Sequence, residues 1–102
     1  MTLMEFSIIP LDKGESVSAH VARCLDIIDS SGLEYRLHSM GTVVEGELHQ
    51  LLDLLQKCFA ELQSDCNRIT CTVKFDYRAG SGSRLESKLE SVQQKLGRDL
   101  KT

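Results

Sequence analysis

The chain has 102 residues, of which 41% are hydrophobic and 26% charged, with a formal net charge of -3. This length suits one domain with a single core, which we expect to span residues 1–102. No apolar run approaches the roughly 20 residues of a membrane-spanning helix, and Glu5 interrupts the apolar start that a signal peptide would need. We therefore expect a cytoplasmic protein without a membrane partner, and the lack of a basic block disfavours nucleic acid.

The first third of the chain predicts a strand followed by a helix. Residues 3–10 alternate between apolar and polar side chains, as a half-buried strand does, and Pro10 ends the pattern. Ser16 is the expected N-cap of the helix, and Gly32 suits its left-handed C-terminal end. Apolar residues recur at helical spacing and form one stripe, made of Val17, Val21, Cys24, Leu25 and Ile28.

Two further strands, over residues 33–40 and 42–47, meet at a turn that contains Gly41. In the second of them Val43 and Glu45 point one way, and Thr42 and Val44 point the other. Because both faces carry a valine, the alternation does not determine which face is buried, and so it does not place Glu45.

The second half of the chain repeats the pattern and adds a helix. Residues 47–65 carry the strongest helical periodicity of the chain, and residues 68–77 alternate cleanly. The side chains of this strand that we expect in the core are Ile69, Cys71, Val73, Phe75 and Tyr77. After a flexible loop over residues 79–83, a last helix is predicted over 84–97, with a frayed tail over 98–102. Its narrow apolar stripe consists of Leu85, Leu89, Val92 and Leu96, which suits packing on its own sheet or on a partner subunit.

The predicted order is β-α-β-β-α-β plus one helix, which is the ferredoxin-like arrangement of the α+β class. Right-handed crossovers place the two main helices on one face of a four-stranded antiparallel sheet. The other face is half polar, and is therefore solvated, binds a ligand or pairs with a second subunit. This fold hosts many unrelated activities, so it does not assign a function.

Cysteine and histidine spacing predicts no metal site, no catalytic constellation and no cofactor. The four cysteines contain no CxxC pair, and Cys24, Cys58 and Cys71 fall on apolar faces where a thiol packs as a small hydrophobe. The pattern says least about Cys66, which lies near a helix end. The histidines, at positions 20, 38 and 49, share no ligand spacing.

Glu45 is the residue with two open interpretations. A carboxylate next to apolar strand positions is solvated, paired or in contact with a ligand, because burying it alone is expensive. An exposed charge is the commoner outcome. The alternative is a ligand anchor near Ser7, Tyr35, Met40 and Thr42, where a ring, a sulfur and a carboxylate together would suit a flat cationic heteroaromatic.

Three segments of the chain carry a family resemblance: FSIIPL (6–11), SGLEYRLHSMGTVVEGE (31–47) and RLESKLESV (84–92). They resemble the small thiamine-binding proteins of the MTH1187-like or UPF0045/DUF77 family, which are similar to each half of the YkoF proteins. The resemblance implies a ferredoxin-like subunit, homodimers formed through sheet edges and homotetramers built from two dimers. It also implies binding of thiamine, or of its hydroxymethylpyrimidine part, without turnover. By position, the ligand-binding residues that it implies are Ser7, Tyr35, Met40, Gly41, Thr42, Glu45 and Gly46, with Arg84 and Lys88 near the last helix.

We therefore expect a non-catalytic binding protein that serves sequestration, delivery or salvage of thiamine, one of its phosphates or the pyrimidine. Arg84 and Lys88 would contact a phosphate, or else belong to a solvated helix face. Two alternatives stay open. One is an interaction protein whose polar sheet face is a subunit interface, and the other is a small enzyme that uses Glu45 as general acid or base.

Overall fold

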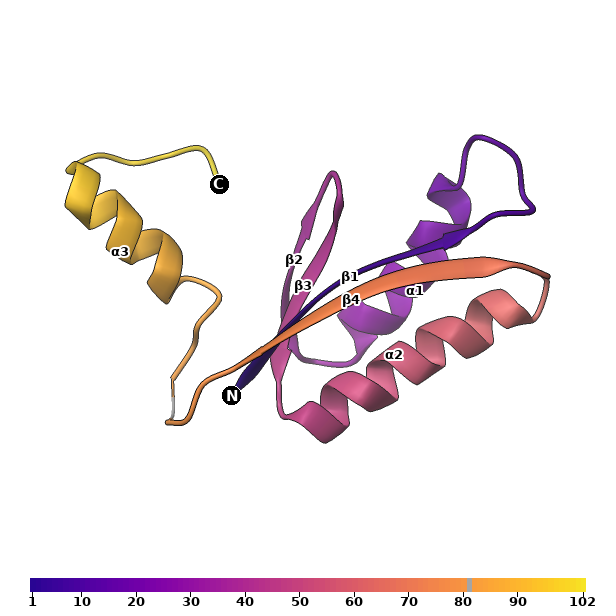
Figure 1. The fold of residues 1–102 in the computed structure, drawn as a ribbon, viewed down its shortest axis with the longest axis horizontal. Coiled ribbons are helices and arrows are strands. Elements are labelled where there is room, and N and C mark those ends of the chain that lie inside the picture. Colours follow the sequence, from indigo (N-terminus) through magenta and orange to yellow (C-terminus); the bar gives the residue numbers. More distant parts are fainter. Residues whose placement is uncertain (81) are drawn as a thin grey trace.

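A four-stranded antiparallel sheet lies at the centre of the computed structural model, which describes residues 1–80 and 82–102 (Figure 1). Its strands are β1 (Thr2–Pro10), β2 (Glu34–His38), β3 (Gly41–Gly46) and β4 (Ile69–Tyr77), in the spatial order β2-β3-β1-β4. The helices are α1 (Ser18–Ser30), α2 (Leu48–Gln63) and α3 (Ser87–Leu96). Figure 1 shows α1 and α2 on one face of the sheet and α3 standing apart from them. The predicted ferredoxin-like order with an additional helix is confirmed.

No helix within the described ranges is both long enough and apolar enough to cross a bilayer. The predicted loop over residues 79–83 includes Ser81, which lies outside the described residues.

The register of β3 against β1 decides which face of the sheet each side chain occupies. Met4 pairs with Val44, and Phe6 pairs with Thr42. Met4, Phe6 and Val44 are all buried in the core beneath the helices, so Thr42 and Val44 face α1 and α2. Because side chains alternate along a strand, Glu45 faces the opposite, open side of the sheet.

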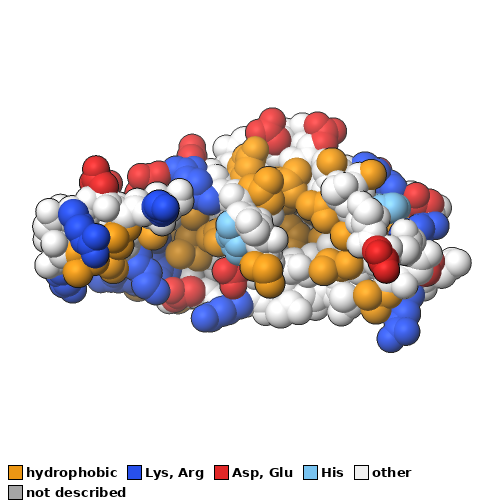
Figure 2. Space-filling model, turned by 90° about the horizontal axis from the view of Figure 1, so that it is seen from above, with side chains coloured by type: hydrophobic (Ala, Val, Ile, Leu, Met, Phe, Trp, Pro, Cys, Tyr) orange, Lys and Arg blue, Asp and Glu red, His pale blue; other side chains and the backbone are white. Residues whose placement is uncertain are grey.

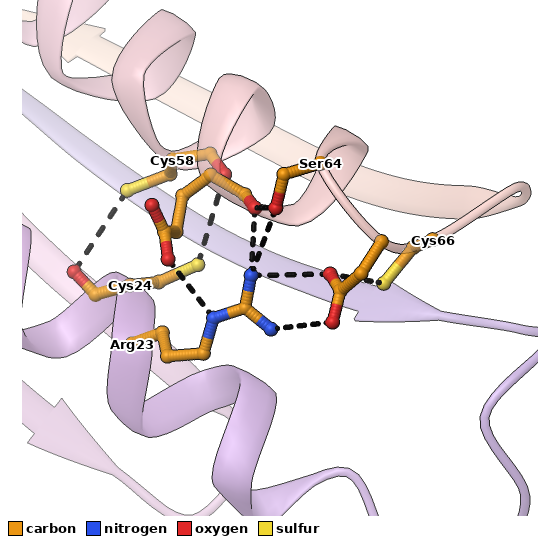
Figure 3. A network of polar contacts seen from close by, with 7 residues as sticks. Arg23, Cys24, Cys58, Ser64 and Cys66 are labelled. Carbon is orange, nitrogen blue, oxygen red and sulfur yellow. Dashed lines mark hydrogen bonds and ion pairs between the residues drawn. The ribbon is translucent and has the colours of Figure 1, made fainter.

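The core lies between the sheet and the two main helices. Helix α2 buries a stripe of residues against it, made of Leu51, Leu54, Cys58 and Leu62. Its first turn is closed by a capping box in which the side chains of Glu47 and Gln50 bond each other's backbone amides. Cys24 of α1 and Cys58 of α2 meet between the helices, each sulfur 3.9 Å from the other's carbonyl oxygen (Figure 3). Both are free buried thiols, as the sequence predicted.

Two local predictions were wrong. Ser16 does not cap α1, because the helix begins only at Ser18 and no side chain caps it. Phe75 and Tyr77 lie on the helix side of β4, yet they are 41% and 72% exposed, because α2 packs over β1 and β3 rather than over this end of β4. The left-handed glycine after α1 is confirmed, with a φ of 78° at Gly32.

Candidate ligand-binding site

A cavity forms where β1 continues beyond the end of β3. Strand β3 pairs with β1 only as far as Phe6, whereas β4 pairs with β1 as far as Pro10. Beyond this point the β2–β3 hairpin diverges from β1 (Figure 1). From Ser7 onward, the edge of β1 that faces the hairpin has no strand partner among the described residues. The first half of α1 lies over this opening, and the enclosed volume is about 250 Å³.

The cavity is lined mainly by apolar side chains. Helix α1 and its N-cap residue contribute Val17, Val21, Cys24 and Leu25 to this lining, and β1 and the β2–β3 hairpin contribute the rest. The apolar set is Phe6, Ile8, Ile9, Val17, Val21, Cys24, Leu25, Leu37 and Met40. Polar groups come from Ser7, His38, Ser39 and Thr42. Viewed from above, hydrophobic side chains gather in a hollow between the hairpin and α1 (Figure 2). An apolar cavity with a few polar groups is the usual form of a small-molecule site.

His38 links the cavity to a carboxylate at its rim. Its Nδ1 accepts a hydrogen bond from the backbone N–H of Met40 at 3.3 Å, and its Nε2 lies 3.6 Å from a carboxylate oxygen of Glu5. Since Nδ1 accepts, the ring carries a proton on Nε2, directed at Glu5. A negative charge therefore lies one imidazole ring away from the cavity, which suits a cationic ligand.

Gly41 is required by the close approach of two strands. A Cβ atom at this position would lie 2.8 Å from the carbonyl oxygen of Phe6. Any larger residue would push the start of β3 away from β1, at the point where the cavity opens.

The structure brings four of the nine predicted site residues to the cavity: Ser7, Met40, Gly41 and Thr42. Met40 is 84% exposed and lies at the rim. Tyr35 faces α1 but does not line the cavity; its hydroxyl donates to the Asp29 carboxylate at 2.7 Å, a bond that raises the pKa of the phenol. Gly46 lies at the far end of β3.

Glu45 occupies a different place from these four residues. It is only 5% exposed on the open face of the sheet, where its Oε2 accepts the backbone N–H groups of Arg84 and of Leu85, the latter at 3.2 Å. The Arg84 guanidinium in turn bonds the Asp76 carboxylate at 2.7 Å and holds the pKa of that carboxyl below its ordinary value. Glu45 therefore ties the segment before α3 to the sheet, and α3 begins at Ser87 rather than at the predicted residue 84.

Arg84 and Lys88 line a second groove, beside α3. This groove, of about 490 Å³, also contains Arg78 and Lys95, and no described residue lines both it and the α1 cavity. Four cationic side chains around one groove suit an anionic group. The structure thus separates the predicted residues into a cavity set, a Glu45 set and a basic groove.

Sequence reasoning missed the α1 side of the cavity. The helical spacing predicts that Val17, Val21 and Leu25 belong to one apolar stripe that packs on the core, yet of that stripe only Cys24 and Ile28 are buried. One signal in the sequence was the length of this stripe, which continues to the start of the helix. In the structure this end of the stripe lies opposite the part of β1 that does not pair with β3. His38 was also missed, because a lone histidine in a strand carries no motif.

Comparison with known proteins assigns the chain to a family. The model of a family described as thiamine-binding protein matches residues 4–93. UPF0045 protein MJ1052 of Methanocaldococcus jannaschii is 33% identical over 88 residues, covering 86% of this chain and 88% of the relative. UPF0045 protein YqgV of Bacillus subtilis is 33% identical over 102 residues, covering 94% and 98%.

Solved structures agree with this result. The crystal structure of MJ1052 superposes with a TM-score of 0.83 at 31% identity, covering 91% of this chain and 96% of that one. A domain of unknown function DUF77 from Bacillus cereus superposes with a TM-score of 0.77 at 26% identity, covering 92% and 91%. The match of the family model over most of the chain, together with relatives above 30% identity, shows that this chain belongs to the thiamine-binding protein family of UPF0045 proteins.

Proposed function

We propose that the protein binds thiamine, or its hydroxymethylpyrimidine part, without turnover, in the cavity between α1 and the β2–β3 hairpin. The observation that carries this proposal is the edge of β1 from Ser7 onward, which has no strand partner within residues 1–80 and 82–102 and lies beside an apolar lining. Backbone N–H and C=O groups that lack a partner need one, and an exposed strand edge pairs with a ligand that offers donors and acceptors along one side. The aminopyrimidine ring of thiamine presents such an edge on a flat body.

The size of the cavity and the charge near it favour one orientation of bound thiamine. A volume of about 250 Å³ is slightly below the roughly 300–1,000 Å³ of sites that enclose a drug-sized ligand. The pyrimidine ring therefore enters, and the cationic thiazolium ring stays at the mouth. Glu5, 3.6 Å from Nε2 of the lining residue His38, offers a carboxylate to that cation.

A cavity-filling substitution tests the site. Val21 lines the cavity, and Ala22 follows it on the exposed side of α1. We expect titration calorimetry to detect binding of thiamine and of hydroxymethylpyrimidine to the wild type and to Ala22→Phe, but not to Val21→Phe. Unchanged binding by a folded Val21→Phe would refute the cavity as the site.

The variant Glu45→Gln distinguishes two hypotheses: that the ligand binds in the cavity, or that Glu45 is its anchor, as the sequence suggested. If Glu45 holds the ligand, the variant loses about 1.5–3 kcal/mol of binding free energy, the worth of a charge-assisted hydrogen bond. If the ligand binds in the cavity instead, we expect little change in its affinity, because Oε2 of Glu45 already accepts two backbone amides.

The same titration with thiamine phosphates, into wild type and Lys88→Gln, tests whether the basic groove receives a phosphate.

Binding without chemistry is supported by the place of Glu45. A general acid or base must be within reach of the substrate, and Glu45 is buried on the open face of the sheet and does not line the cavity in which we place the ligand. We expect thiamine incubated with the protein to be recovered unchanged by mass spectrometry. Accumulation of a cleaved or modified product would favour the enzyme alternative. If the ligand is bound and released unchanged, we infer that the protein serves its sequestration, delivery or salvage. Cytoplasmic residence stays a prediction of the sequence.

We further propose that copies of the chain associate into homodimers and, from these, homotetramers. Strand β4 is an edge of the sheet, and an open edge with apolar neighbours is a template for pairing. Phe75 and Tyr77 are exposed along it, and α3 exposes Leu89, Val92 and Leu96. Light scattering should show an oligomer for the wild type and for Gln94→Asp, and a smaller species for Val92→Asp. A wild-type monomer at micromolar concentration would contradict this proposal.

A further inference from the structure

Three potential metal ligands meet where α1 begins and α2 ends. His20 lies in the first turn of α1, and Asp65 and Cys66 follow the C-terminus of α2. One imidazole nitrogen, one carboxylate oxygen and the thiol sulfur all lie within 4.8 Å of one another. The residues are far apart in the sequence, and only the packing of α1 against α2 brings them together. None of them lines the thiamine cavity or the basic groove.

His20 has a buried ring nitrogen without a partner in the described part of the chain. Its Nδ1 is buried, and among the residues that the structure describes none forms a hydrogen bond with it. A buried polar atom without a partner is destabilising, so native structures rarely keep one. An imidazole nitrogen with a free lone pair is also the commonest protein ligand of transition metals.

Cys66 supplies a soft ligand in a protected position. It is 7% exposed, and its thiol donates to Oδ1 of Asp65 at 3.5 Å. The sulfur therefore carries the proton of that hydrogen bond in the absence of a cation. A bound ion would take the place of that proton, which is released to solvent as the sulfur–metal bond forms.

Arg23 holds the carboxylate in place from the other side. Its guanidinium bonds Oδ2 of Asp65 at 2.9 Å and Oδ1 at 3.1 Å, and its Nε bonds Glu61 at 3.0 Å (Figure 3). Each carboxylate oxygen has more than one lone pair, so Asp65 can accept from Arg23 and still coordinate an ion. Hydrogen-bonded outer partners of this kind fix the orientation of metal-binding carboxylates. Asp12 and Glu61 offset the positive charges of Arg23 and Lys13 around the site.

We propose that His20, Asp65 and Cys66 bind a divalent zinc-like ion and thereby fasten the start of α1 to the end of α2. Imidazole, carboxylate and thiolate are all zinc ligands, and three protein ligands with water as the fourth are an established zinc geometry. Oxygen-seeking ions such as Mg²⁺ and Ca²⁺ are disfavoured by the thiolate. Zinc bonds of about 2.0–2.3 Å place tetrahedral ligands about 3.3–3.8 Å apart. Cys66 Sγ and Asp65 Oδ1 already lie 3.5 Å apart, and the other separations, all within 4.8 Å, need only a small closure when the ion enters. Exposed Asp65 gives the ion its entry path.

Cobalt and zinc titrations of the chelator-treated, reduced protein test this site. Co²⁺ bound by a thiolate gives an intense sulfur-to-cobalt absorption band, which reports on the cysteine directly. We expect one ion per chain, with this band, in the wild type. Zn²⁺ at about 100 times its Kd should raise the Tm by roughly 10 °C or more.

Matched variants locate the ligands. Cys66→Ser should abolish the cobalt band and weaken zinc affinity by more than the roughly 10–100-fold that losing an outer partner costs, whereas Cys71→Ser should retain both. His20→Gln should weaken zinc binding in the same way, while His49→Gln, on the exposed start of α2, should not. Circular dichroism of each metal-free variant checks its fold, and if Cys66→Ser is unfolded then His20→Gln decides.

Three outcomes would overturn the proposal: a wild type without the cobalt band, a band that survives in Cys66→Ser, or equal zinc affinity in the wild type and a folded His20→Gln. The proposal does not depend on thiamine binding. Val21→Phe should therefore still bind Zn²⁺ although it no longer binds thiamine.

Discussion

Replacement of Glu45 by alanine should release the segment that carries α3 and leave the sheet and its two covering helices folded. The carboxylate is buried, and its Oε2 is the acceptor for two consecutive backbone amides, those of Arg84 and Leu85. A hydrogen bond to a charged group contributes about 1.5–3 kcal/mol, so the pair contributes about 3–6 kcal/mol. The freed amides rehydrate as the segment opens, so the lower end of this range applies.

Hydrogen exchange is the appropriate assay, because the effect is local. A loss of about 3 kcal/mol lowers the protection of an amide by roughly 100-fold. We expect this loss for the amide of Leu85 and for α3, while the amides of β1 and α2 retain their wild-type protection. The core is formed by β1, β3 and the two main helices. Neither the Glu45 carboxylate nor the amides of Arg84 and Leu85 belong to this core, so we expect it to stay folded in the variant.

Glu34→Ala is the matched control. Glu34 pairs with Glu45 across β2 and β3 and projects from the same face of the sheet, but it is exposed, and its ion pair with Arg36 is long, at 4.0 Å. It should leave the exchange of α3 unchanged. The reasoning would be refuted by wild-type protection of Leu85 in Glu45→Ala, or by an equal loss in both variants.

Three further predictions concern the fold around the site. Gly41→Ala should destabilise the protein by about 1–3 kcal/mol in urea unfolding and weaken thiamine binding, because its Cβ would lie 2.8 Å from a carbonyl oxygen of β1; wild-type values for both would contradict the close approach. Arg84 lowers the pKa of Asp76, so the ion pair stabilises α3 attachment above the ordinary pKa of 3.8 and is lost as the pH falls through the lowered value. An NMR titration should show the carboxyl pKa rising in Arg84→Gln, and an unchanged pKa would exclude the pair. Leu51→Ala should cost about 2–5 kcal/mol in urea unfolding because Leu51 is fully buried, whereas exposed Leu52→Ala should cost about 0.5 kcal/mol or less; similar losses would contradict the orientation of α2.

The local periodicity of the sequence determined the elements and their order. The leucine pattern of α2 and the alternation of β1 are each specified within about ten residues, because the helix and strand periods place every third or fourth, or every second, side chain on one face. Gly32 and Gly97 marked helix ends for the same reason, since a left-handed residue favours glycine wherever it occurs. The chemistry of the residues around Glu45 suggested Ser7, Met40 and Thr42, which line the cavity, and the resemblance to a known family added Gly41.

Only the tertiary structure decided what each face contacts. The alternation of β3 allowed either face to be buried, and the pairing of Met4 with Val44 placed Glu45 on the open side. The cavity exists because β3 ends before β1 does, which is a property of two strands and not of either alone. The meeting of His20 with Cys66 likewise depends on how α1 packs against α2. Spacing along the chain fixes which side chains share a face, but contacts between distant segments depend on register and packing, which local sequence does not encode.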